Sequence, residues 1–108
     1  MSDQTRIQIN YKDLPHSDAL EAHINKEVEA ALSHHADRVT RVEVHVGDES
    51  SVRKHTPMDK RCMFEIRPAG FDPLSIEEHA DDIFEAVSAA SGKAKRALTR
   101  LLDKHDAR

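Results

Sequence analysis

Apolar and polar residues alternate along three segments of the chain, 6–11, 39–46 and 61–67. Strict alternation places every second side chain on the same side of an extended backbone. In the second of these segments, for example, Val42 and Val44 fall on one side, and the charged residues Arg41 and Glu43 fall on the other. Each segment is therefore predicted to be a β-strand with one buried face and one solvent-exposed face.

Two other segments, 18–37 and 82–105, have apolar residues at every third or fourth position, which is the spacing of an amphipathic helix. Ser17 or Asp18 is suited to cap the first helix, with Glu21 as the capping-box partner of Asp18. The apolar positions are Leu20, Ile24, Val28, Ala31 and Leu32 in the first helix, and Ile83, Val87, Ala90, Ala94, Leu98 and Leu101 in the second.

The remaining segments complete a β-α-β-β-β-α order. Residues 74–79 predict a short fourth strand after a Pro- and Gly-containing turn at 68–73, and the polar segment 47–60 predicts a long connection. A crossover helix makes the first two strands parallel, whereas short turns make the later strands antiparallel. We therefore expect a two-layer α+β fold, with a four-stranded mixed sheet and both helices packed on its single apolar face.

The composition is typical of one compact domain, because the 108 residues are 38% hydrophobic and 33% charged. Only four residues are aromatic, so the core must consist mostly of aliphatic side chains, which argues against a deep cofactor pocket. Cys62 is the single cysteine, and its pattern places it inside the core rather than in a disulfide or a metal site. Since the sequence lacks a signal-peptide pattern and an apolar run of about 20 residues, we expect a cytoplasmic protein without a membrane partner.

Catalytic and metal-binding patterns are weak. The sequence has no Gly-rich phosphate loop, no Ser-His-Asp set and no paired-carboxylate cleft, so it predicts neither an enzyme nor a small-molecule substrate, and no cofactor. His34, His35, His23 and Asp37 are ligand types, but adjacent helical residues point about 100° apart, so no metal site is predicted. The eight histidines suggest the hypothesis that pH adjusts the charge of the protein.

Positive charge is concentrated near the end of the chain. The formal net charge is −4, yet the last eighteen residues hold six of the 16 Lys and Arg. At 100° per residue, Lys93, Arg96, Arg100 and Lys104 fall within about 80° of one another on the second helix. Two interpretations stay open: these cations complement the helix dipole, or they contact successive phosphates of a nucleic acid.

Further candidate RNA-binding residues lie outside this helix. The polar connection contains Arg53, Lys54 and Lys60, and the first helix contains Lys26. A cationic loop beside a basic helix is a common supplement to RNA contacts. A solvated loop explains the same residues without any partner, so both interpretations remain.

The segment DDIFEAVSAASGKAKRALTRLLDK resembles the final helix of the ribosome hibernation-promoting factor and ribosome-associated inhibitor family, the sigma-54 modulation proteins. IQIN followed by SDALEAHI is similar to the first strand and helix start of that family, and Asp37-Arg38-Val39 is similar to its Asp-Arg-Ile. The positions of the final helix that match are Asp82, Ile83, Phe84, Ala86, Val87, Lys93, Arg96, Leu98 and Arg100.

The resemblance implies a bacterial protein that binds the ribosomal RNA of the small subunit in the tRNA–mRNA channel and inhibits translation in stationary phase or stress. It also implies a short, single-domain form that spans 1–108 without the C-terminal dimerisation domain of long family members. The first helix departs from the basic pattern of the family, because Lys26 is its only Lys or Arg. Two alternatives therefore stay open: a general duplex-RNA-binding module, and a diverged domain that acts through protein partners.

Overall fold

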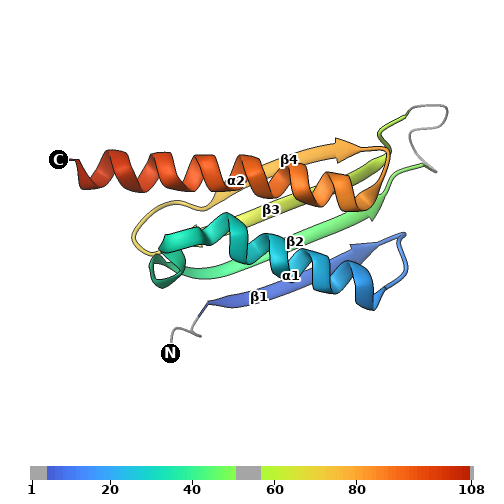
Figure 1. Cartoon of the computed structure of the whole chain (residues 1–108), viewed down its shortest axis with the longest axis horizontal. Coiled ribbons are helices and arrows are strands. Elements are labelled where there is room, and N and C mark those ends of the chain that lie inside the picture. Colours follow the sequence, from blue (N-terminus) through green and yellow to red (C-terminus); the bar gives the residue numbers. More distant parts are fainter. Residues whose placement is uncertain (1–4, 51–56, 108) are drawn as a thin grey trace.

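The computed structural model describes residues 5–50 and 57–107 of the chain. These residues form four strands, two α-helices and one 3₁₀ helix in the predicted order (Figure 1). The elements are β1 (Arg6–Lys12), α1 (Asp18–Leu32), η1 (Ser33–Arg38), β2 (Val39–Asp48), β3 (Lys60–Pro68), β4 (Leu74–Ala80) and α2 (Ile83–Asp106).

The strands form one mixed sheet in the order β1-β2-β3-β4. β1 and β2 are parallel because α1 crosses between them, and the other two pairs are antiparallel. The register aligns the apolar positions of all four strands, so that Ile9, Val44, Phe64 and Ile76 lie opposite one another in a single row. The predicted α+β fold and its mixed topology are confirmed.

Both helices lie over the same face of the sheet, and the opposite face has no helix (Figure 1). The core lies between the two layers, and the strands contribute Val42, Val44, Val46, Cys62, Phe64 and Ile66 to it as fully buried side chains. Burial raises the pKa of the Cys62 thiol to about 12, so the thiol stays protonated and unreactive at neutral pH. The prediction that Cys62 is a core residue is therefore confirmed.

The helix ends differ in detail from the prediction. Ser17 caps α1, since its hydroxyl accepts a hydrogen bond from the Leu20 amide at 3.2 Å. α1 ends at Leu32, five residues earlier than predicted, because Ser33 adopts a positive φ of 50° and the chain continues as η1. In α2, Leu102 is fully buried and Leu101 is only half-buried, so the predicted apolar stripe was wrong by one residue at its end.

Within the described ranges, no helix is both long enough and apolar enough to span a membrane.

Candidate nucleic-acid interface

The 24-residue helix α2 carries four of the eight predicted RNA-binding residues and is held at both ends. At its start, the Asp82 carboxylate accepts a hydrogen bond from the Phe84 amide at 2.9 Å. Near its end, Arg38 of η1 donates to the Asp106 carboxylate at 2.8 Å, and this contact lowers the pKa of Asp106. The ring of Phe71 also packs edge-on against His105 in the same turn. These contacts fix the direction of the exposed face of α2.

Helix α1 holds α2 from the side through polar contacts. The Ser91 hydroxyl is buried and donates to the Glu27 carbonyl oxygen at 2.8 Å. One turn earlier, Ser88 donates to the Glu27 carboxylate at 3.2 Å, and the His23 ring lies 3.0 Å from the Ser88 hydroxyl. The Phe84 ring packs against His23 with centroids 5.2 Å apart. The two helices therefore form one rigid layer.

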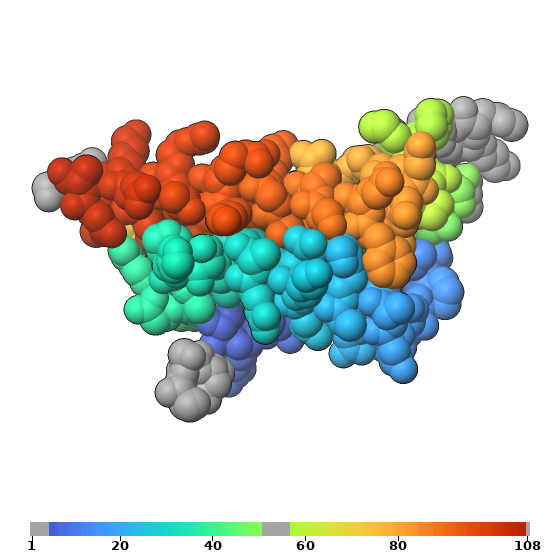
Figure 2. All heavy atoms as spheres, viewed as in Figure 1, coloured from blue at the N-terminus to red at the C-terminus, as the bar shows by residue number. Residues whose placement is uncertain are grey.

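We call Lys93, Arg96, Arg100 and Lys104 the α2 ridge. All four side chains are exposed, as the helical spacing predicted. Lys93 forms an ion pair with Glu78 of β4 at 3.2 Å. The other three have no ion-pair partner among residues 5–50 and 57–107. Figure 2 shows α2, coloured orange to red, as an uncovered band along one long side of the molecule. The α2 ridge is therefore accessible to a polyanion.

A shallow hollow on α2 lies beside the α2 ridge. We call it the Gly92 hollow, and it is lined by Gly92, Lys95, Arg96, Thr99 and Arg100. It forms because Gly92 has no side chain between the long cationic ones. Lys95 was missed as a site residue by sequence reasoning, since it lies on the other flank of the helix from the α2 ridge. Three cations therefore surround a depression on an exposed helix, which is a favourable setting for a phosphate group.

Two of the remaining predicted RNA-binding residues, Lys26 and Lys60, lie in the described part of the chain. Lys26 is exposed on α1 and has no ion-pair partner in the described part of the chain. Lys60 lies at the start of β3, where its ammonium is 2.7 Å from Asp59 and 3.6 Å from Asp48. The hydrogen bond to Asp59 raises the pKa of Lys60 above its usual value. Arg53 and Lys54 lie outside the described residues. Of these residues, the two that the structure describes, Lys26 and Lys60, therefore lie on other elements than the α2 ridge.

Three arginines on the helix-free face of the sheet, Arg41, Arg61 and Arg67, are each close to an acid. Arg41 donates to Glu43 at 2.8 Å, which lowers the pKa of that carboxyl group. The other two pairs are Arg61 with Glu77 at 2.8 Å and Arg67 with Glu65 at 3.6 Å. We call these three arginines the sheet arginines. Their charge is largely compensated inside the protein.

The histidines considered for metal binding do not form a cluster. His34 is exposed and His35 is half-buried in η1, whereas His23 is engaged with α2. Ligand-type atoms come within 4.8 Å of one another in two other groups of the described residues, which sequence reasoning did not identify. These groups are His16, Asp18 and Glu21, and Glu43, His45 and Glu65.

Comparison with known structures shows the same fold in two bacterial proteins. A ribosomal subunit interface protein from Coxiella burnetii superposes with a TM-score of 0.75 at 16% identity, covering 95% of this chain and 99% of that one. The N-terminal domain of Protein Y from Thermus thermophilus superposes with a TM-score of 0.68 at 15% identity, covering 90% and 94%. Both likenesses lie below 25% identity and establish the fold alone.

Sequence comparison adds the family. No curated protein matches the chain at a significant level. The sequence profile described as sigma 54 modulation protein / S30EA ribosomal protein matches residues 7–106, which is nearly the whole chain. The matched range includes both helices and the entire α2 ridge. The chain therefore belongs to the sigma 54 modulation protein / S30EA ribosomal protein family.

Proposed function

We propose that this protein binds the small ribosomal subunit and inhibits translation, with the α2 ridge and the Gly92 hollow in contact with ribosomal RNA phosphates in the tRNA–mRNA channel. One observation carries the proposal. Arg96, Arg100 and Lys104 are exposed without an acidic partner in the described part of the chain, whereas the sheet arginines are paired. A cation without an internal partner gains more binding free energy from a phosphate than a cation that is already paired with an acid.

The physical basis of binding is electrostatic and needs no chemistry. Each cation that contacts a phosphate releases condensed counterions, so the binding constant falls as the salt concentration rises. Side chains three or four residues apart on a helix are about one turn apart, which allows them to reach successive phosphates. Duplex RNA is recognised largely by shape and by backbone contacts. A rigid layer with a line of cations is suited to that kind of recognition.

Family membership and the structural neighbours support the ribosome as partner. The Coxiella burnetii neighbour is described as a ribosomal subunit interface protein, and the family description includes a ribosomal protein. We extend this partner to the present chain, and we place the protein in the cytoplasm because ribosomes are there. Lys26, Arg53, Lys54 and Lys60 are proposed as supplementary contacts, with Lys60 the weakest because acids already surround it.

Co-sedimentation with purified small subunits and whole ribosomes, at about 50 and 300 mM salt, tests the proposal. The variant with Lys93, Arg96, Arg100 and Lys104 all changed to Glu is run beside the wild-type protein. We expect salt-sensitive association of the wild type and none of the variant. Circular dichroism of both proteins checks that the exposed substitutions leave the fold intact.

Two other results contradict the proposal in distinguishable ways. Absence of wild-type association at low salt would indicate that the protein acts through protein partners instead. Equal binding to ribosomes and to an unrelated RNA duplex would indicate a general duplex-RNA-binding module. A matched control changes the sheet arginines Arg41 and Arg67 to Gln, which should leave the association intact.

A further inference from the structure

A hollow of about 420 Å³ lies at one end of the helix-free sheet face, opposite to the layer that contains the α2 ridge. Its floor is the backbone around Gly47 on β2, a residue that is buried although it has no side chain. A Cβ atom at this position would come within 3.2 Å of the Lys12 carbonyl oxygen. Glycine therefore keeps this part of the sheet surface open. We call the site the Gly47 hollow, and its volume is within the range of small-molecule pockets.

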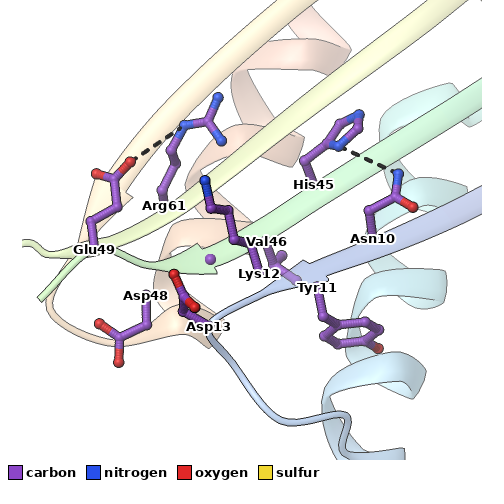
Figure 3. Close-up of a pocket in the computed structure, with 10 residues that line it drawn as sticks. Asn10, Tyr11, Lys12, Asp13, His45, Val46, Asp48, Glu49 and Arg61 are labelled. Carbon is purple, nitrogen blue, oxygen red and sulfur yellow. Dashed lines mark hydrogen bonds and ion pairs between the residues drawn. The ribbon is translucent and has the colours of Figure 1, made fainter. Parts of the chain in front are cut away.

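Two cations border the Gly47 hollow from neighbouring strands. Gly47 pairs with Lys12 of β1 on one side and with Arg61 of β3 on the other. The two side chains rise on the same side of the sheet, whereas Tyr11 and Asp48 point away from it (Figure 3). Lys12 has no ion-pair partner in the described ranges, and Arg61 uses its Nε atom for Glu77 at 2.8 Å. Because Arg61 is already paired through Nε, Lys12 supplies the uncompensated charge of the hollow, and the terminal nitrogens of Arg61 add a second donor group across from it.

The next row of side chains on the same face contains His45, whose ring is held in a fixed orientation. The Asn10 side-chain amide lies 3.4 Å from Nδ1 of His45, and Nε2 of His45 lies 3.4 Å from the Glu43 carboxylate. Gln8 donates to the other end of the Asn10 amide at 3.3 Å. Both ring nitrogens are thus engaged at the ring edge, and His45 lines the hollow. Aromatic rings and guanidinium planes are the usual stacking partners of unpaired bases.

Three acids also line the hollow, Asp13, Asp48 and Glu49, and the position of Glu49 narrows the class of ligand. Glu49 lines the hollow, with its carboxylate 3.1 Å from His79 and 3.9 Å from Nε of Arg61. A bare phosphate would be repelled by this carboxylate, whereas a ribose hydroxyl next to a phosphate would donate a hydrogen bond to it. A ligand with a phosphate, a hydroxyl and a planar ring therefore matches the cations, the Glu49 carboxylate and the His45 ring of the hollow.

We propose that the Gly47 hollow binds a nucleotide, with its phosphate between Lys12 and Arg61 and its base against His45. The nucleotide is either a free mononucleotide or an unpaired nucleotide of an RNA, since both present the same groups. The site is separate from the α2 ridge and lies on the other face of the sheet. Nucleotide binding there is independent of the contact proposed for the ribosome.

Amide chemical shifts of ¹⁵N-labelled protein, followed during titration, test this site. The probes are adenosine 5′-monophosphate, inorganic phosphate, adenosine and a single-stranded RNA tetranucleotide. We expect saturable shifts at Asn10, Lys12, Gly47 and Arg61 with the monophosphate, and an affinity at least about fivefold above that of phosphate or adenosine alone. Tighter binding of the tetranucleotide at the same amides would identify RNA as the source. Weaker binding of the tetranucleotide would identify the free nucleotide.

Two variants make the test specific. Lys12→Gln should weaken monophosphate binding about fivefold or more, because it removes a charge-assisted contact, while leaving ribosome association unchanged. Lys104→Gln removes the same charge from α2 and should leave monophosphate binding unchanged. The proposal is wrong if Lys12→Gln binds like the wild type, if phosphate alone binds as tightly as the monophosphate, or if the shifts occur only on α2. It is also wrong if no saturation appears at about 10 mM monophosphate.

Discussion

The α2 ridge and the sheet arginines are both lines of cations on exposed surfaces, but they differ in their neighbours. Arg41, Arg61 and Arg67 each lie within 3.6 Å of a glutamate on the same or the next strand. On the α2 ridge, only Lys93 has an acidic partner among the residues that the structure describes. The comparison teaches that two surfaces with similar numbers of cations can differ in how many of those charges are already paired, and we propose that this difference decides which surface binds a polyanion.

The difference follows from the geometry of the two elements. On a helix, residues three and four positions apart are neighbours, and on α2 such spacings join Lys93 to Arg96, Arg96 to Arg100 and Arg100 to Lys104. On a sheet, each side chain is close to the residue opposite it and to the next one along the same face. Glu43 and Glu65 lie two residues along the same strand from Arg41 and Arg67, and Glu77 lies diagonally across from Arg61, opposite Met63. The three sheet arginines are therefore paired inside the protein, and on our proposal the unpaired cations of the α2 ridge meet an external partner.

The largest effect is expected from removing two free cations of the α2 ridge. Arg96→Gln with Arg100→Gln should weaken small-subunit binding about 10- to 100-fold at low salt and reduce the slope of log K against log salt by about 2. Filter binding or sedimentation at four salt concentrations measures both quantities. The melting temperature should stay unchanged, since neither residue has an internal partner in the described part of the chain.

The matched change on the other surface should give the opposite pattern. Arg41→Gln with Arg67→Gln removes the same number of charges, but it leaves Glu43 and Glu65 opposite each other without their arginine partners. We expect a lower melting temperature and a ribosome affinity within about twofold of the wild type. A loss of affinity as large as that of the Arg96 and Arg100 variant would show that pairing does not decide which cations bind.

A smaller difference should appear within the α2 ridge itself. Lys104→Gln should reduce the salt slope by about 1, whereas Lys93→Gln should reduce it by clearly less, because Glu78 already compensates part of the Lys93 charge. Changing Glu78 to Gln in the wild type should then strengthen binding slightly. Equal slopes for the two lysine variants would contradict this ranking.

The smallest effect is expected at Gly92, where stability and binding should change in opposite directions. An added Cβ atom would lie 3.6 Å from the Arg96 guanidinium, which is an ordinary contact. Gly92→Ala should therefore raise the free energy of unfolding by about 0.5–1 kcal/mol, because alanine favours the helix. The methyl group also fills part of the Gly92 hollow, so ribosome affinity should fall slightly. Urea denaturation and the binding assay measure the two changes, and an unchanged or lower stability would contradict the helix argument.

Most of the fold was predictable because each strand has only one apolar face. Alternation at Val42 and Val44 or at Phe64 and Ile66 determines which side faces the helices, and the order of elements then restricts the topology. The end of α1 was not predictable in the same way. Ser33 adopts a positive φ without being glycine, so no residue type marked the point where the helix stops.

The candidate site was predictable only in part. Exposure of the α2 ridge follows from spacing along one helix, which the sequence contains directly. Ion pairing depends on contacts between elements: Lys93 meets Glu78 of β4, and Lys60 meets Asp48 at the opposite position of β2. Such partners require the strand register and the packing of α2. Lys95 was missed for a related reason, since the hollow that it lines arises from the absent side chain of Gly92.

Site-specific photo-crosslinking tests the central claim most directly. A photoreactive residue replaces Thr99, which lines the Gly92 hollow, or Ser75, which is exposed on β4 opposite Glu65 of the sheet face. Each protein is bound to purified small subunits, irradiated, and analysed for the RNA to which it is linked. We predict a crosslink to small-subunit ribosomal RNA from position 99 and none from position 75. A crosslink from position 75 alone would show that the sheet face meets the ribosome and would contradict the account.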